Sequence, residues 1–212
     1  MKEKDVIYED VLTTGLTQPL VDTGIDYIEM GVDYFVDNEV VKEIPVVKTF
    51  ASLLKIGMSI KERHFIKKLL TFLHEFHSKK LSSGERETFL ANYNSNEEYR
   101  NKVVTFVVTS IDRFFDAEQA KIKGNLFVAH IKGLLEWEDY VILCGCLDRF
   151  QAIAKDSLDE MEKQKEPYHA MYGNVFDPGM SILLSCGMAI NQAHHFFVNI
   201  LGILIHQYGI KA

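Results

Sequence analysis

The chain has 212 residues, of which 47% are hydrophobic, so it is long enough to bury a substantial core. Its formal net charge of −7 argues against a protein whose main task is to neutralise phosphate groups, and we expect no nucleic-acid partner. Strand signals are rare, and the four prolines and 13 glycines leave little room for a linker. We therefore predict an all-α fold, a single compact bundle of about eight helices with a small hairpin as an option near the C-terminus.

The cysteines and the N-terminal residues favour a cytoplasmic protein. The three cysteines are an odd number, and no apolar segment follows a basic one at the start of the chain. Cys144 and Cys146 would point to different sides of a helix, so we interpret them as buried small hydrophobes and not as metal ligands. By composition we divide the chain into a helical bundle core, residues 1–165, and an apolar, charge-poor segment, residues 166–212, that packs on the same domain.

Two helices are expected before residue 40. Residues 5–14 predict a short, weakly amphipathic helix that ends at Gly15, and residues 17–37 predict a second helix with an apolar heptad seam. A stripe of carboxylates adjoins that seam. It consists of Asp22, Asp26, Glu29 and Asp33. Three interpretations of the stripe are open: a cation site, a docking surface for a basic partner, or a solvated helix face, which we favour. The sequence contains no Glu-x-x-His motif that would complete a di-metal site.

Two more helices are expected between residues 43 and 80. Pro45 allows a helix to begin near Val46, and Gly57 is placed where that helix ends. Ser59 and Glu62 form a capping-box pattern that opens a strongly amphipathic helix of about five turns. Several basic residues lie off its apolar face. They include Lys61, His64, Lys67 and Lys68.

Charge is unevenly distributed along this part of the chain. Residues 1–60 carry five basic and eleven acidic residues, whereas residues 61–80 carry six basic and two acidic residues. The two segments either pair within the molecule or each face a partner. We therefore take the four carboxylates and the four basic residues as candidate interaction residues. His74 and His77 form an HxxH pair without a third ligand at a definite spacing, so we expect them to be surface or boundary residues and assign no metal.

The central region contains three further helix starts, at Ser82, Ser95 and Asp116. The short loops between them make sequential helices antiparallel neighbours. The run 103–111 is rich in β-branched residues, yet its cap and its flanks favour a buried helix over a strand. SIDRFF at 110–115 is echoed by CLDRFQ at 146–151, which suggests two similarly built helical hairpins.

The longest helix is expected from Glu136 to about residue 163, with Trp137 as a core or boundary anchor. From residue 166 to the end only Glu166, Asp177 and Lys211 are charged. We favour a core helix, a turn or hairpin and a closing helix here; an interface for a partner or a second copy, and insertion into a membrane surface, stay open. Some winged-helix modules end similarly, but the scarcity of basic residues argues against DNA binding.

One block carries a resemblance to other proteins. DNEVVKEIPVVKTFASLLKIGMSIKERHFIKKLLTFLHEF, at 37–76, together with the DRFF segment after it, resembles a group of uncharacterised bacterial and mobile-element proteins. The resemblance covers residues 20–150 and an LLSCGMA-type segment near the end. It implies a soluble helical protein of the bacterial cytosol, in an accessory or defence-linked system. It implies no activity and no site residues.

Motifs for catalysis are absent from the sequence. There is no Gly-rich phosphate loop, no nucleophile elbow and no cluster of metal ligands, so we assign no catalytic residue and no cofactor. The leading hypothesis is a non-enzymatic protein-interaction or assembly module that has a protein partner or forms a homo-oligomer. The alternative is a peripheral membrane-binding effector, in which segments 44–58 and 180–205 insert while Lys61, Lys67 and Lys68 meet anionic lipid.

Overall fold

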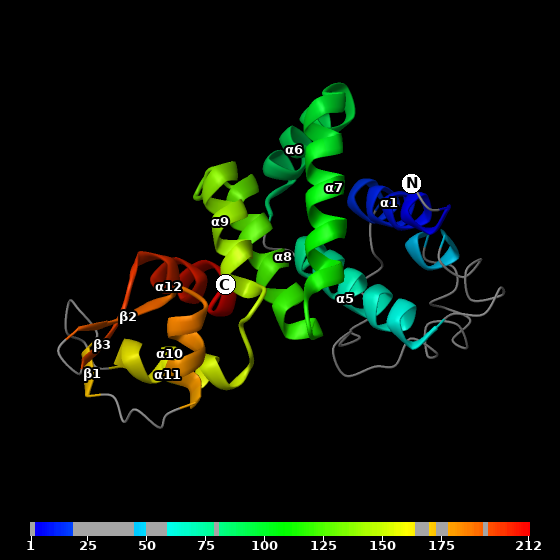
Figure 1. Cartoon of the computed structure of the whole chain (residues 1–212). Coiled ribbons are helices and arrows are strands. Elements are labelled where there is room, and N and C mark those ends of the chain that lie inside the picture. Colours follow the sequence, from blue (N-terminus) through cyan, green and yellow to red (C-terminus); the bar gives the residue numbers. More distant parts are fainter. Residues whose placement is uncertain are drawn as a thin grey trace. The chain divides into compact units, whose positions relative to one another are not determined.

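The computed structural model describes residues 3–18, 45–49, 59–78, 81–163, 170–172, 178–192 and 195–212, which are mainly helical (Figure 1). The all-α prediction is confirmed, and the optional hairpin near the C-terminus is present. By their contacts the residues form two compact units, Met1–Gly124 and Asn125–Ala212. The division falls inside helix α8 (Ala117–Ile131) and not near residue 165, where the composition changes.

Three helices that contact one another organise the first unit. They are α1 (Glu3–Thr17), α5 (Ile60–His77) and α7 (Glu97–Arg113), and α6 (Ser83–Ser95) packs on α7 (Figure 1). The apolar face of α5 is buried, as its periodicity predicts. Its buried apolar residues are Phe65, Ile66, Leu69, Leu70, Phe72, Leu73 and Phe76.

Helix α1 continues past Gly15, where the sequence predicted its end. A Cβ atom at Gly15 would collide with the side chain of Leu73 on α5. The glycine therefore serves a close approach of two helices and not a helix stop. The Tyr8 and Phe65 ring centroids, 4.2 Å apart, make a second contact between α1 and α5.

The predicted helix starts at Ser59 and Ser82 are confirmed. Each serine side chain accepts a hydrogen bond from the backbone N–H three residues later, and the glutamate there, Glu62 or Glu85, accepts from the serine backbone N–H. Both are complete capping boxes, which satisfy N–H groups that the first helical turn leaves without partners.

The predicted cap at Ser95 is wrong by one residue. Ser95 is the last residue of α6, and its hydroxyl donates to the carbonyl of Ala91 at 2.7 Å. Asn96 caps α7 instead, because its side-chain oxygen accepts from the Tyr99 N–H at 3.0 Å. The pattern of serine three residues before glutamate was present, but the neighbouring asparagine is an equally good cap.

The β-branched run 103–111 is helical within α7, as predicted, and packs over a buried lysine of α8. The side chain of Lys123 is fully buried. Its Nζ contacts the hydroxyl of Ser110, donates to the carbonyl of Phe106 at 3.4 Å and lies 4.3 Å from the Phe106 ring centroid. These contacts compensate the ammonium group for lost water.

The single long helix expected over 136–163 is wrong. Two helices occupy it, α9 (Trp137–Leu147) and α10 (Ile153–Lys163). Between them Phe150 is buried, and its N–H donates to the carbonyl of Leu147 at 3.0 Å. Phe114 is also buried after the end of α7, with its N–H 3.3 Å from the carbonyl of Ile111. The two Asp-Arg-Phe segments thus end two helices in the same way.

A three-stranded antiparallel sheet belongs to the second unit. Its strands are β1 (Ala170–Tyr172), β2 (Ala189–Gln192) and β3 (His195–Val198), in the order β1-β3-β2. In register, Ala170 pairs with Phe197 and Ala189 pairs with Val198. The central strand β3 thus pairs with β1 on one side and with β2, its hairpin partner, on the other.

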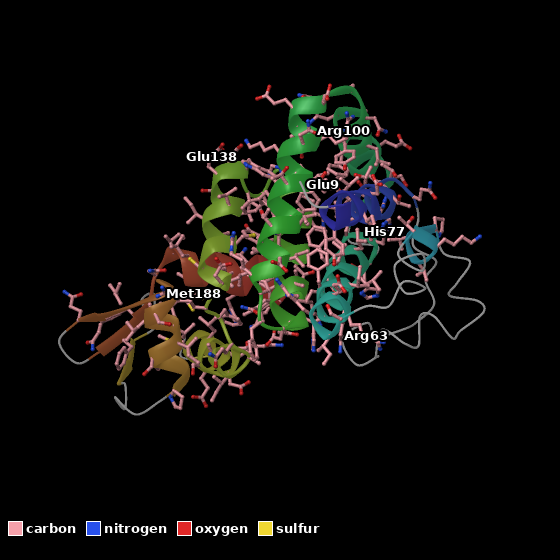
Figure 2. The ribbon with its side chains drawn as sticks, turned by 45° about the vertical axis from the view of Figure 1, so that its right-hand side comes forward. Glu9, Arg63, His77, Arg100, Glu138 and Met188 are labelled. Atoms are coloured by element: carbon pink, nitrogen blue, oxygen red, sulfur yellow. The ribbon has the colours of Figure 1, made fainter. Side chains whose placement is uncertain are left out.

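Helices complete the second unit around this sheet. Helix α11 (Pro178–Ser185) packs on α10, and α12 (Ile200–Ile205) contacts β3 and α9 before it passes into a π-helical turn, η1 (His206–Ile210). A Cβ atom at Gly202 would lie 2.6 Å from the carbonyl oxygen of Met188, a residue labelled in Figure 2. Only glycine allows α12 to approach that backbone.

The three cysteines are free thiols in buried or half-buried environments. Cys144 and Cys186 are buried, and burial raises the pKa of the Cys146 and Cys186 thiols, which disfavours the reactive thiolate. Across the ranges given above, no three His, Cys, Asp or Glu side chains are grouped so that they could hold a metal ion. No helix in those ranges is both long and apolar enough to cross a membrane.

Candidate functional site

The predicted interaction residues fall into two groups. The carboxylates Asp22, Asp26, Glu29 and Asp33 lie outside the described residues. The four basic residues belong to the first half of α5, where Figure 2 labels their neighbour Arg63. The candidate site is therefore built from α5 and from the elements that adjoin its first half.

Lys61, His64 and Lys67 are accessible, as their position off the apolar face predicted. Lys61 and His64 are exposed and Lys67 is half-buried. The Nζ of Lys61 lies 3.4 Å from the Oδ2 of Asp112, near the end of α7. Because both groups are exposed, this pair orients the side chains more than it stabilises the fold.

Lys68 is the exception, because its side chain is buried at 6% exposure. Its Nζ donates to the carbonyl oxygens of Phe114 at 2.7 Å and Asp112 at 3.3 Å. Desolvation lowers the pKa of Lys68, while the charge of Asp112 acts in the opposite direction. The ammonium group thus lies at the carbonyl end of α7, where the helix dipole favours a cation. Lys68 is a structural residue and not part of the accessible surface charge.

Replacing Lys68 by methionine is expected to lower the free energy of unfolding by about 1–3 kcal/mol. Methionine keeps an apolar stem but leaves the Phe114 carbonyl without its donor. Lys67→Met is the matched control, since Lys67 is half-buried beside it, and a change within about 0.5 kcal/mol is expected. Urea unfolding followed by circular dichroism measures both. Equal effects of the two substitutions would contradict the structural role of Lys68.

A hollow of about 600 Å³ opens beside these residues. It is lined by His64, Lys67, Lys68, Phe115, Asp116, Ala117 and Glu118. The side chain of Phe115 is 86% exposed, although phenylalanine is usually buried. An aromatic ring thus stands in solvent among charged groups of both signs.

Residues 114–116 connect α7 to α8 and include Phe115, and hydrogen bonds hold this connection on both sides. The carbonyl of Phe114 accepts from Lys68, and the N–H of Phe115 donates to the Oε1 of Gln119 at 2.6 Å. The same Oε1 accepts from the Asp116 N–H at 3.0 Å, and the Asp116 carboxylate accepts from the Gln119 N–H at 3.1 Å. The last bond confirms the predicted cap at Asp116. The backbone at Phe115 is therefore fixed, and its ring is presented without the support of a core.

Sequence reasoning missed Phe115, although a signal was present. When the DRFF segment is aligned with DRFQ at 148–151, Phe114 corresponds to Phe150 and Phe115 corresponds to Gln151. Phe150 is buried and Gln151 is exposed. A polar residue at the equivalent position indicates that the second phenylalanine of the pair points to solvent.

His77, the second histidine of the HxxH pair at the end of α5, is half-buried and has partners on two other helices. The Nδ1 of His77 lies 3.1 Å from Nη1 of Arg86, and its Nε2 lies 2.6 Å from the carbonyl oxygen of Gly15. Because arginine only donates, Nδ1 accepts and Nε2–H donates, so the ring is neutral. Burial lowers the pKa of His77 to about 4; the Gly15 bond opposes this, and the charges of Arg86 and His74 add to it. His77 therefore joins α1, α5 and α6.

The surroundings of Phe115 combine an exposed apolar ring with charges of both signs. An exposed ring on a fixed backbone, next to the cations of α5 and the carboxylates of Asp116 and Glu118, offers apolar area and charge to a partner surface. The resemblance to bacterial and mobile-element proteins stays a prediction. No protein-family model, no curated protein and no solved structure matches this chain.

Proposed function

We propose that the chain is a non-enzymatic, cytosolic protein-interaction module, in a bacterial accessory or defence-linked system of the kind that the resemblance implies. The docking surface is the Phe115 face, which we define as Lys61, His64, Lys67, Phe115 and Asp116. The observation that carries this proposal is the 86% exposure of Phe115 on a backbone fixed by Lys68 and Gln119.

Energetic considerations support a partner at this face. Full burial of a phenylalanine side chain contributes about 1.5–3 kcal/mol, so one ring can act as an anchor. The fixed backbone reduces the entropy that is lost when the partner binds. The accessible cations of α5 favour a partner that carries carboxylates around an apolar pocket, and they increase the association rate more than the affinity.

Site-specific photo-crosslinking tests the proposal. The photoreactive phenylalanine analogue p-benzoylphenylalanine is placed at position 115 of the full chain, in cells that express the chain naturally. The matched control carries the same group at Ile142 of α9, which is 52% exposed and belongs to the second unit. We expect a discrete adduct, with a partner or with a second copy, from position 115 and none of the same mass from position 142.

A charge reversal checks that the adduct depends on the whole face. Lys67→Glu in the position-115 chain is expected to reduce the adduct about tenfold, whereas Lys132→Glu, in the second unit, leaves it unchanged. Sedimentation velocity of the unmodified chain tells a second copy from a different partner. No adduct from position 115, or the same adducts from both positions, would contradict a protein-interaction role for this face.

A peripheral membrane role is the alternative, and an exposed ring beside lysines would also suit anionic lipid. The segments expected to insert give it less support, because Val46, Val47, Met180 and Leu183 are buried. Co-flotation with anionic liposomes that is lost in Phe115→Ser would favour this alternative over a protein partner.

A further inference from the structure

Strand β2 forms one edge of the three-stranded sheet in the second unit (Figure 1). Ala189, at its start, is buried, whereas Ile190, Asn191 and Gln192 are exposed. Proteins protect such edges with charged residues, proline or bulges, because an uncovered edge strand can pair with another chain. Strand β2 contains no charged residue and no proline, and its register with β3 runs without a bulge.

The hydrogen bonds between β2 and β3 determine which peptide groups of β2 point away from β3. The N–H of Asn199 donates to the carbonyl of Met188 at 3.0 Å, one pair beyond Ala189 and Val198 in the same register. Hydrogen-bonded and non-hydrogen-bonded pairs alternate along an antiparallel ladder. Ala189 and Asn191 therefore belong to non-hydrogen-bonded pairs, so their N–H and C=O groups point to the open edge. In the described part of the chain no backbone group bonds to them there.

The side chain of Ile190 adds exposed apolar area to this edge. It is 49% exposed, and its partner in the register is half-buried Phe197 of β3. Residues that lie opposite each other in a ladder share a face of the sheet, so both side chains contribute to one apolar strip. The hairpin from residue 189 to residue 198 contains no Asp, Glu, Lys or Arg. Two copies of it can therefore approach without repulsion between like charges.

We infer that β2 pairs in antiparallel orientation with β2 of a second copy of the chain, so that the two sheets become one. In the register centred on Ile190, Ala189 of each copy lies opposite Asn191 of the other. Both residues have outward peptide groups, and a hydrogen-bonded pair exchanges both of its N–H···O bonds. Every outward N–H and C=O group of β2 then has a partner.

This register explains why the occupant is a second copy and not a strand of another protein. It places Ile190 opposite Ile190 of the second copy in a non-hydrogen-bonded pair, where facing side chains are closest. The exposed isoleucine is thus covered by its own equivalent, and no charged side chain is left to be matched. Such an interface is isologous, so it closes at two copies.

The interface is small, because β2 has only 4 residues. We therefore expect a weak dimer with a dissociation constant on the order of 100 µM. The inference goes beyond the proposed function and does not depend on it, since the Phe115 face belongs to the first unit and β2 belongs to the second.

Sedimentation equilibrium of the full chain between about 10 and 500 µM tests the dimer. Ile190→Lys places two ammonium groups opposite each other and is expected to weaken the dimer at least about tenfold. Ile153→Lys, at the start of α10, is the matched control because Ile153 is 47% exposed, and it should leave the dimer unchanged. Circular dichroism checks that each variant is folded.

Phe115→Ser distinguishes this dimer from self-association through the Phe115 face, and it should also leave the dimer unchanged. A monomer throughout the concentration range would overturn the inference. So would a dimer that persists in Ile190→Lys or one that is lost in Phe115→Ser.

Cysteine substitution tests the register. In Ile190→Cys the two facing Cα atoms would lie about 4.5 Å apart, within the range of a disulfide. Gln192→Cys is the matched control, because Gln192 is exposed and lies two residues along the same strand. Its two copies would be separated by about four residues along the strands, roughly 13 Å, which is too far for a disulfide.

The cysteine variants are incubated with reduced and oxidised glutathione and run on a non-reducing gel. We expect a covalent dimer from Ile190→Cys and at least about tenfold less from Gln192→Cys. The wild type gives the background of the native thiols, which are buried or half-buried. Equal yields from the two positions, or no covalent dimer from Ile190→Cys, would refute the pairing of β2 with itself.

Discussion

Replacing Phe114 by alanine is expected to lower the free energy of unfolding of the first unit by about 3–5 kcal/mol. The Phe114 side chain is only 3% exposed, and its ring centroid lies 5.7 Å from the Nζ of buried Lys123. Truncation opens a cavity next to that ammonium group and removes part of its favourable surroundings. The cost therefore includes lost apolar burial and weaker stabilisation of a buried charge.

Phe115→Ala is the matched control for this prediction. The two residues are adjacent and chemically identical, yet Phe115 is 86% exposed, so its truncation should change stability by less than about 0.5 kcal/mol. Urea unfolding followed by far-ultraviolet circular dichroism measures both variants. Similar losses in the two variants would mean that Phe114 is not the core member of the pair. Phe115→Ala should instead lose the partner without losing the fold.

The stability of the first unit is expected to fall by up to about 3 kcal/mol as the pH is lowered from about 6.5 to about 4. Folded His77 has a pKa of about 4, whereas an unfolded histidine takes up a proton near its ordinary value of about 6.5. Between these values the unfolded state binds more protons, so acid favours unfolding. The stabilisation is complete above pH 6.5 and is lost as the pH falls through the folded pKa.

His77→Gln separates this residue from the other titrating groups. Glutamine can donate to the carbonyl of Gly15 and accept from Arg86 without binding a proton. The loss of stability between pH 7 and 4.5 should therefore be clearly smaller in His77→Gln than in the wild type, whereas exposed His64→Gln keeps the wild-type loss. Trp137, the only tryptophan, lies in the second unit, so its fluorescence follows that part separately. The same acid sensitivity in all three chains would exclude His77 as its cause.

Local rules explain most of what could be predicted about the fold. The capping boxes at Ser59 and Ser82 and the periodicity of α5 depend on residues three or four apart, which the sequence displays directly. The break between α9 and α10 has no proline at it, and Phe150 is buried there. Tertiary burial of that kind overrides local helical preference, so the hydrophobic periodicity alone predicts one uninterrupted helix across the break.

The candidate site was predictable only in part. Lys61, His64 and Lys67 lie off the apolar face of α5 and are accessible, as a helical projection indicates. Lys68 looked equivalent, but its partners are carbonyl groups at the end of α7, and only the tertiary structure brings that helix end to α5. A long lysine stem packs like an apolar chain when its ammonium group finds such acceptors. The exposure of Phe115 depends on the same connection.

The connection between α7 and α8 also limits how the sequence can evolve. Lys68 and Gln119 bind the carbonyl and the N–H of the same peptide group, which joins Phe114 to Phe115, so inserting or deleting one residue there would exchange the inward and outward positions of the two phenylalanines. Related chains should therefore keep its length and the identity of its inner residue. The outer position is 86% exposed, so the fold tolerates other side chains there, except proline, which lacks the N–H that donates to Gln119. Partner choice can then diverge through a single codon while the fold is inherited unchanged.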